Sequence, residues 1–195
     1  MQKIILASQS PRRKQLLEWA EVPFEVIVQH TPETFPEDMN AEEVPVYIAR
    51  QKALEVQKNL QQKEEGEVPE IILAADTIVV LDNRIIGKPA DRADAISILT
   101  SLSDRAHRVI TGVVILHKKG EVAFSEVTHV HFHGLTQQQI EFYIDKYQPY
   151  DKAGAYAIQE WIGVVGIQSV SGDFYNVMGL PVSRVVKELE KIGNE

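Results

Sequence analysis

The chain has 195 residues, and its 28 acidic and 20 basic side chains give a formal net charge of −8 at pH 7. Hydrophobic residues make up 44% of the sequence, an ordinary globular share that excludes a disordered chain. No cysteine is present, which excludes disulfides, thiolate catalysis and cysteine-based zinc sites. The length predicts a single domain over residues 1–195, within which two small lobes can share one core.

Charge and hydropathy also restrict the partners and the location that the sequence predicts. A negative net charge argues against a broad nucleic-acid interface, which requires a basic face. No apolar segment approaches the ~20 residues of a membrane span, and the first apolar run, residues 4–7, is too short for a signal peptide. We therefore expect a cytoplasmic protein with neither a nucleic-acid nor a membrane partner. An anionic ligand must then bind where cations gather locally.

The predicted elements alternate between strands and helices. In the first half we expect a strand at 4–7, a helix at 11–19, a strand at 24–28, a helix at 44–59 and a strand at 71–81. The last of these is either a strand pair or one strand that enters a turn at Asp82-Asn83. In the second half we expect a helix at 93–101, a hairpin of 109–116 and 122–133, a helix from the Thr136 cap to 147, a strand at 163–169 and a helix at 180–192. This order predicts an α/β protein with a mixed twisted β-sheet flanked by helices.

The segment ILASQSPRR is the first candidate for binding chemistry. A buried strand ends at Ser8, Ser10 stands where a helix N-cap belongs, and Pro11 falls at the first helical position. Arg12 and Arg13 follow in the first turn, where cations oppose the helix dipole. An anion at the helix start would resolve this conflict. A capped surface helix with two solvated arginines explains the same residues, and both interpretations stay open.

Asp76 is the second candidate, because it lies inside the apolar run IILAADTIVVLD. A buried carboxylate requires a cation, a metal or a set of hydrogen bonds, and we favour a functional role over a purely structural one. Lys88 in the turn Gly87–Pro89, Lys52 on the helix 44–59 and Glu33 in a loop carry little information individually.

Three further stretches contain polar residues in suggestive patterns. His129, His131 and His133 share one face of a predicted strand, and we favour an exposed polar face over a metal site. The segments 151–159 and 172–181 mix small and polar residues, which indicates close backbone packing or a ligand. The polar stretch 57–67 is typical of a helix end that runs into a solvated loop, and it is a weak candidate for a lobe boundary.

Six stretches together resemble the Maf family of nucleotide pyrophosphatases. They are LASQSPRR, AADTIVV, GKP, HRVITGV, DKAGAYAIQ and NVMGLP, and they follow the family order from residue 6 to residue 181. The resemblance implies a Maf or inosine-triphosphate-pyrophosphatase-like fold with a cleft between two lobes. Within the family, Arg12, Thr77 and Gln159 are similar to the branch that hydrolyses dTTP and UTP to the monophosphate and pyrophosphate. The branch acting on 7-methyl-GTP has Gln in place of the threonine and Glu in place of the glutamine.

The resemblance also implies a role for each candidate residue. It makes Asp76 the proton acceptor and Lys52 and Lys88 further catalytic residues. The residues that bind phosphate are then Ser8, Ser10 and Arg13, and those that select the base are Arg12, Thr77 and Gln159. Glu33 and Asp76 are the ligands of a divalent metal, Mg²⁺ or Mn²⁺. It suggests a homodimer. The alternatives are a nucleotide-binding regulator of septum formation with little turnover, and an enzyme for modified pyrimidine nucleotides.

The chain departs from the family pattern at two places. Glu160 and Trp161 follow Gln159, where the family usually has glycine after the glutamine, and this extra carboxylate could alter the choice of base. Pro32 precedes Glu33, where the family often has an acidic residue, which weakens the prediction of a metal ligand in that loop.

Overall fold

The structure is a computed structural model, and it describes residues 2–63 and 71–194. In chain order the elements are β1 (Ile4–Leu6), α1 (Pro11–Trp19), β2 (Phe24–Val26), α2 (Val44–Lys63), β3 (Ile71–Leu81), β4 (Arg84–Ile86), α3 (Arg92–Leu102), β5 (Ala106–His117), β6 (Gly120–Phe132), α4 (Gln137–Tyr147), the 3₁₀ turn η1 (Ala153–Ala155), α5 (Trp161–Gly166), β7 (Ile167–Ser171), α6 (Phe174–Met178) and α7 (Val182–Gly193). None of the helices within these ranges is long and apolar enough to cross a membrane.

The strands form a mixed sheet, which confirms the predicted α/β class. Its order is β2-β1-β3-β5-β6-β7, and β4 pairs with β3. β1 runs parallel to both β2 and β3, whereas β3–β4 and β6–β7 are antiparallel pairs. Asp82 and Asn83 both have positive φ, 46° and 64°, as a tight turn between antiparallel strands requires. The 71–81 segment is therefore one strand that enters a turn.

The chain divides into two compact units. The first contains Met1–Asp76, Thr111–Glu126 and Gly179–Glu195, and the second contains Thr77–Ile110 and Val127–Met178. The division passes through the three long strands β3, β5 and β6. A single domain over 1–195 and a cleft between two lobes stay predictions. The polar stretch 57–67 continues α2 to Lys63, and its remainder lies outside the described residues.

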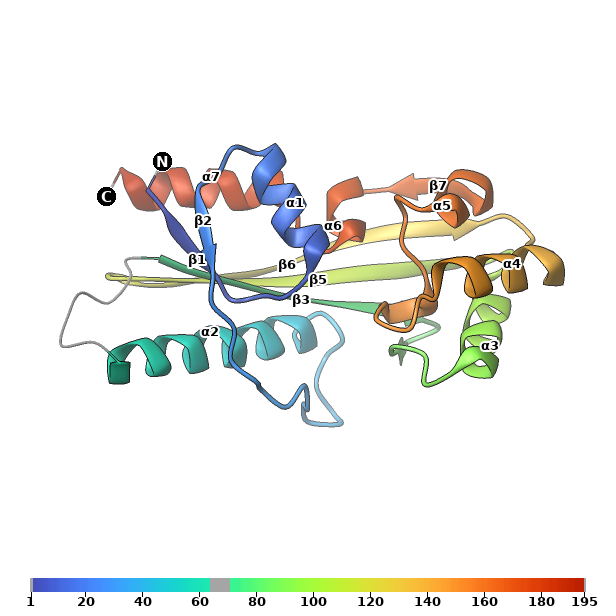
Figure 1. Ribbon diagram of the computed structural model, residues 1–195, viewed down its shortest axis with the longest axis horizontal. Helices are drawn as coiled ribbons and strands as arrows, with labels where there is room; N and C mark the ends of the chain where they lie inside the picture. Colours follow the sequence, from blue (N-terminus) through green and yellow to red (C-terminus); the bar gives the residue numbers. More distant parts are fainter. Residues whose placement is uncertain (1, 64–70, 195) are drawn as a thin grey trace. The chain divides into compact units, whose positions relative to one another are not determined.

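In the first unit, α2 lies on one face of the strands and α1 and α7 lie on the opposite face (Figure 1). Ala49, Ala53 and Val56 of α2 are buried in a core with residues of β1, β3 and β5, so they form the face of the helix that packs on the sheet. Gly112 of β5 allows a close approach of the strand to α2, because a Cβ atom there would lie 2.2 Å from Pro45 C and Val46 N. The glycine therefore fixes the distance between β5 and the start of α2.

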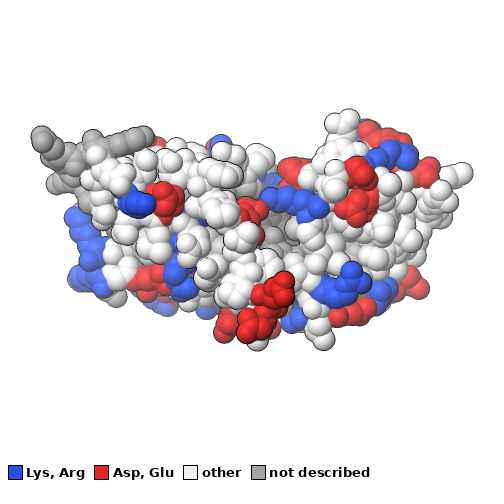
Figure 2. All heavy atoms as spheres, turned by 90° about the horizontal axis from the view of Figure 1, so that it is seen from below, with Lys and Arg blue, Asp and Glu red and all other residues white. Residues whose placement is uncertain are grey.

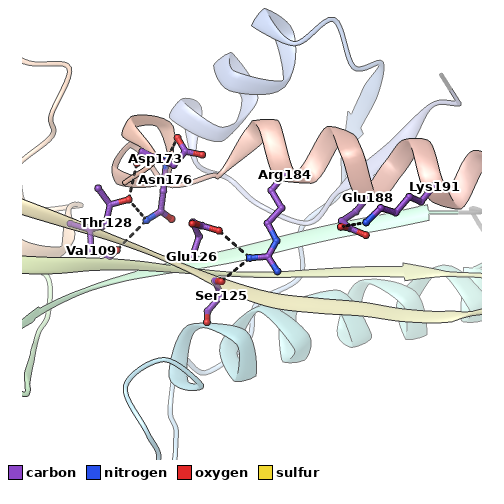
Figure 3. A network of polar contacts seen from close by, with 9 residues as sticks. All are labelled: Val109, Ser125, Glu126, Thr128, Asp173, Asn176, Arg184, Glu188 and Lys191. Atoms are coloured by element: carbon purple, nitrogen blue, oxygen red, sulfur yellow. Dashed lines mark hydrogen bonds and ion pairs between the residues drawn. The ribbon is translucent and has the colours of Figure 1, made fainter. Parts of the chain in front are cut away.

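In the second unit, the side chains of two distant segments are joined by buried hydrogen bonds (Figure 3). Asn176 is fully buried, and its Nδ2 donates to Val109 O at 3.1 Å and to Thr128 Oγ1 at 3.0 Å. Thr128 Oγ1 in turn donates to Asp173 O at 2.8 Å, and Asp173 Oδ1 accepts from Tyr175 N at 2.7 Å. These bonds attach α6 to strands β5 and β6.

The strand predicted at 163–169 is wrong over its first half. Residues Trp161–Gly166 form α5, and β7 begins only at Ile167. Backbone N–H groups of Gly163 and Val164 both donate to Glu160 O, and a Cβ on Gly163 would lie 1.7 Å from Ile158 O. The glycine thus permits a tight reversal, which overrides the strand preference of Val164 and Val165.

Candidate active site

Three charged side chains of the first unit meet where β3 passes α2. Lys52 Nζ donates to Asp76 Oδ1 at 2.7 Å and to Glu33 Oε1 at 2.7 Å. The Asp76 and Lys52 side chains are only 13% and 16% exposed, whereas Glu33 is 45% exposed. One ammonium group is therefore shared by two carboxylates, so the buried aspartate has the cationic partner that its apolar surroundings require.

The local fold explains why these groups meet. Residues 71–75 of β3 are all buried, and Asp76 is the first partly exposed residue after them. Lys52 comes immediately before the buried Ala53, so it lies at the border of the helix face that packs on the sheet. Its long alkyl chain can follow that border while the ammonium group reaches the carboxylates.

The start of α1 is held by Arg13 rather than by Ser10. Arg13 is 8% exposed, its Nε donates to Gly179 O at 2.7 Å, and its Nη1 donates to Ser8 Oγ at 3.0 Å. Burial lowers the pKa of Arg13, and the charge of Asp76 opposes that effect. Ser10 is the N-cap residue and Pro11 begins the helix, as predicted, but the Ser10 side chain makes no capping hydrogen bond. The arginine predicted for phosphate binding is thus also an internal anchor.

A cavity of about 230 Å³ in the first unit is lined by some members of both groups, namely Ser8, Glu33 and Lys52. Its polar lining contains Ser8, Gln9, Gln29, His30, Thr31, Glu33 and Lys52, and its apolar lining contains Ala7, Val28 and Val56. Sequence reasoning missed four of these polar residues: Gln9, Gln29, His30 and Thr31. They occupy irregular segments after β1 and β2, where periodicity gives no signal.

Of the remaining predicted site residues, Arg12 lies in α1 of the first unit, whereas Thr77, Lys88 and Gln159 belong to the second unit. Thr77 is half-buried in β3, while Lys88 and Gln159 are exposed in loops. The loop of Lys88 is tied to the DKAGAYAIQ segment, because Gly154 N donates to Gly87 O at 3.1 Å. Gly154 has φ +72°, and a Cβ there would lie 2.9 Å from a methyl group of Val79. The glycine therefore suits both the backbone conformation and the close packing.

A buried histidine supports the same segment of the second unit. His107 Nε2 and the Tyr156 hydroxyl lie 2.7 Å apart, and both rings pack on Phe132. Burial lowers the pKa of His107 to about 4 and raises the pKa of Tyr156. His107 is therefore neutral at pH 7. Sequence reasoning gave neither residue a role, because their contact joins positions 49 residues apart.

The carboxylates Glu33 and Asp76 have the donor chemistry that a magnesium or manganese ion prefers, since both offer hard anionic oxygens. Both oxygens contact Lys52 Nζ, so they lie no farther apart than twice 2.7 Å. Across residues 2–63 and 71–194, no group of three or more His, Asp or Glu side chains is arranged to hold a metal ion. A divalent cation held by these two carboxylates would have to take its other ligands from substrate and water.

Arg13 also takes part in the electrostatics of this cluster: burial lowers its pKa, and the charges of Asp76 and Glu33 both act to raise it. Figure 2 shows basic and acidic side chains interspersed over one face of the molecule. On β6, His129 is exposed and His131 is partly buried, while Val130 and Phe132 are buried, as the predicted alternation requires. The local pairing of Lys52 with two carboxylates thus describes the electrostatics of the site better than the net charge does.

A protein family and curated relatives match almost the whole chain. The family described as "Maf-like protein" matches residues 3–192. The chain is 46% identical over 189 residues to a dTTP/UTP pyrophosphatase of Parabacteroides distasonis, covering 96% of this chain and 95% of the relative. Proteins of the same name from Cytophaga hutchinsonii and Porphyromonas gingivalis are each 45% identical and cover 98% of this chain, with 84% and 94% of the relatives covered.

Among solved structures, the Ham1 protein of Staphylococcus aureus is similar with a TM-score of 0.44 and 15% identity, over 67% of this chain and 72% of that one. The sequence relationship is far stronger, since the family match spans nearly the whole described chain and includes both the Lys52 cluster and the segment of Gln159. The chain belongs to the Maf family.

Proposed function

We propose that this protein hydrolyses dTTP and UTP, and modified pyrimidine triphosphates of similar shape, to the nucleoside monophosphate and pyrophosphate. The relatives that cover most of its length carry the name dTTP/UTP pyrophosphatase. Arg12, Thr77 and Gln159 are the residues that resemble this branch of the family. The single observation that carries the proposal is the partly buried carboxylate of Asp76, held by Lys52 beside Glu33 at the end of an apolar strand segment.

The proposed reaction attacks the α-phosphorus with water. The new bond joins the water oxygen to phosphorus, the bond to the oxygen that bridges the α- and β-phosphates breaks, and pyrophosphate leaves. Asp76 accepts the proton of the water, a contribution of roughly 10²–10⁴-fold for general bases. The ammonium group of Lys52 donates to one oxygen of Asp76 and so orients the carboxylate for this task.

The other residues act on the charge and the base of the substrate. Ser8, Ser10 and Arg13 bind phosphate oxygens near the start of α1, and Lys88 neutralises further negative charge. Arg12, Thr77 and Gln159 select the base. Glu33 and Asp76 would hold a divalent cation, which when bound neutralises phosphate charge and stabilises the leaving group.

A panel of nucleoside triphosphates with detection of pyrophosphate tests the proposed function. We expect Mg²⁺- or Mn²⁺-dependent release from dTTP and UTP and much slower release from GTP and ATP. Saturable binding of dTTP without release of pyrophosphate would refute hydrolysis and favour a nucleotide-binding regulator. Higher kcat/KM for methylated or halogenated pyrimidine triphosphates than for dTTP would identify the modified nucleotides as the preferred substrates.

Asp76→Asn tests the proposed base. The change preserves the size of the side chain and an oxygen that can accept from Lys52, so we expect a folded protein whose dTTP turnover falls by roughly 10²–10⁴-fold. Asp145→Asn is the matched control, because Asp145 is exposed on α4 and pairs with Arg92. Near wild-type turnover of Asp76→Asn would refute the assignment.

A further inference from the structure

Glu160 directly follows Gln159 in the second unit, and its carboxylate is bonded to an internal partner. Glu160 Oε2 accepts a short hydrogen bond from the hydroxyl of Tyr143, and Glu160 Oε1 lies 3.6 Å from Lys152 Nζ. The Glu160 side chain is 22% exposed and that of Lys152 is 10% exposed. The carboxylate is therefore engaged with the body of the second unit through two polar groups.

The Tyr143 hydroxyl bonds to the backbone before Gln159 and to a side chain after it. Tyr143 is fully buried on α4, and its hydroxyl accepts from Ala157 N at 3.1 Å while it donates to Glu160. Ala157 precedes Gln159 by two positions, and Glu160 follows it directly. One phenol hydroxyl thus joins the two ends of the short segment that presents the exposed Gln159 side chain.

Two further contacts restrict the same segment. Ile158, the neighbour of Gln159, is buried, and its carbonyl oxygen faces Gly163 so closely that a Cβ there would lie 1.7 Å away. Lys152 Nζ donates to Asp151 Oδ1 at 2.7 Å and also faces Glu160, so a largely buried cation balances the charge of Glu160. Glycine at position 160 would remove the carboxylate that Tyr143 and Lys152 share.

We propose that Glu160 and Tyr143 form a positioning pair that holds Gln159 in one orientation and so strengthens the preference for pyrimidine triphosphates. This inference rests on the proposed function, since it uses the role of Gln159 in selecting the base. Glu160 acts through the backbone and through Tyr143, and contact between its carboxylate and the base is not required. A fixed amide side chain discriminates between bases more strongly than a mobile one, because less order must be gained on binding.

Steady-state kinetics of Tyr143→Phe, Glu160→Gln and Glu160→Gly with dTTP and GTP test the pair. For Tyr143→Phe we expect KM for dTTP to rise about fivefold, the effect of one lost hydrogen bond of ordinary strength, while kcat and the values for GTP change less. Glu160→Gln keeps an oxygen that accepts from Tyr143, so its preference should remain closer to wild type than that of Glu160→Gly. The double variant Tyr143→Phe/Glu160→Gly should show no larger loss than the stronger single variant.

Tyr147→Phe is the matched control. It removes a phenol hydroxyl one helical turn along α4, from a ring that stacks on Tyr143 with 5.0 Å between centroids. Its substrate preference should equal that of the wild type. Hydrogen exchange provides a second measurement: the Ala157 amide should exchange faster in Tyr143→Phe than in Tyr147→Phe.

The two proposals fail in different ways. Wild-type protein that releases no pyrophosphate from dTTP or UTP would overturn the proposed function and, with it, the role of the pair in base preference. A wild-type pyrimidine preference that persists unchanged in both Tyr143→Phe and Glu160→Gly would overturn the inference alone. Equal loss for dTTP and GTP, or additive effects in the double variant, would also overturn it, because a general structural role predicts these results. If Tyr143→Phe does not fold, the inference is tested by the substrate preference of Glu160→Gln compared with that of Glu160→Gly.

Discussion

Gly112→Ala should disturb both stability and turnover, although Gly112 lies in a buried strand and carries no side chain. A Cβ atom at this position would lie 2.2 Å from Pro45 C and Val46 N and 2.6 Å from Pro45 O. These are backbone atoms at the start of α2, so no side-chain rotation can relieve the overlap. Ordinary contact requires about 3.4 Å, and the strand and the helix must therefore separate by about 1 Å.

The size of the effect follows from that displacement. Overpacking of a well-packed core costs about 1–3 kcal/mol, which lowers Tm by roughly 2–12 °C for a chain of this length. Lys52 lies about two turns further along α2, so the same movement shifts the ammonium group against Asp76. Misplacement of a catalytic group by about 1 Å can reduce turnover by roughly 10²-fold.

Thermal unfolding and dTTP turnover of Gly112→Ala measure both effects, and Gly134→Ala is the control because a Cβ there would meet nothing within 4 Å. Where alanine fits, replacement of glycine stabilises a protein by about 0.4–1 kcal/mol through the unfolded chain. The sign of the change in Tm therefore shows whether alanine fits at position 112. A Tm of Gly112→Ala equal to or above that of the wild type would refute the close approach of β5 to α2, and unchanged turnover would refute its link to Lys52.

Two further predictions concern buried titratable groups. Arg13→Lys should lower the free energy of unfolding, measured in urea, by about 1.5–3 kcal/mol, because lysine cannot bond Gly179 O and Ser8 Oγ together. The control Lys14→Gln, on the same helix, should change this free energy little. His107 has a folded-state pKa of about 4 against 6.5 when unfolded, so the unfolded chain binds the extra proton and stability falls from pH 6.5 towards pH 4. The loss can reach about 3 kcal/mol, and a Tm–pH profile of His107→Gln as steep as that of the wild type would contradict this cause.

Local backbone chemistry made several elements predictable from the sequence. Pro11 begins α1 because its missing N–H costs nothing at a helix start, and Thr136 begins α4 in a capping box with Gln139. Asp82 and Asn83 tolerate the positive φ values that the turn after β3 requires. Each of these signals depends on residues within a few positions of one another, so the sequence carries them directly.

Contacts between distant segments explain what sequence patterns missed. Val164 and Val165 favour a strand by composition, yet α5 forms because Gly163 lets the chain pass close to Ile158 O. The attachment of α6 through Asn176 depends on Thr128, 48 residues earlier, and no local pattern predicts it. Propensity is a weak prior wherever a tertiary contact of this kind decides the backbone.

The candidate site shows that a sequence can single out a residue without revealing which residues contact it. The apolar run around Asp76 predicted that the carboxylate needs a cation, a metal or a set of hydrogen bonds, but not that the partner is Lys52, 24 residues away, which also binds Glu33 of a loop. Arg13, predicted as a phosphate ligand, has two of its nitrogens bonded to Ser8 and Gly179 and therefore fixes the start of α1 as well. Glu160 is a further example: it follows Gln159 directly in the sequence, yet its carboxylate accepts a hydrogen bond from Tyr143 within the second unit.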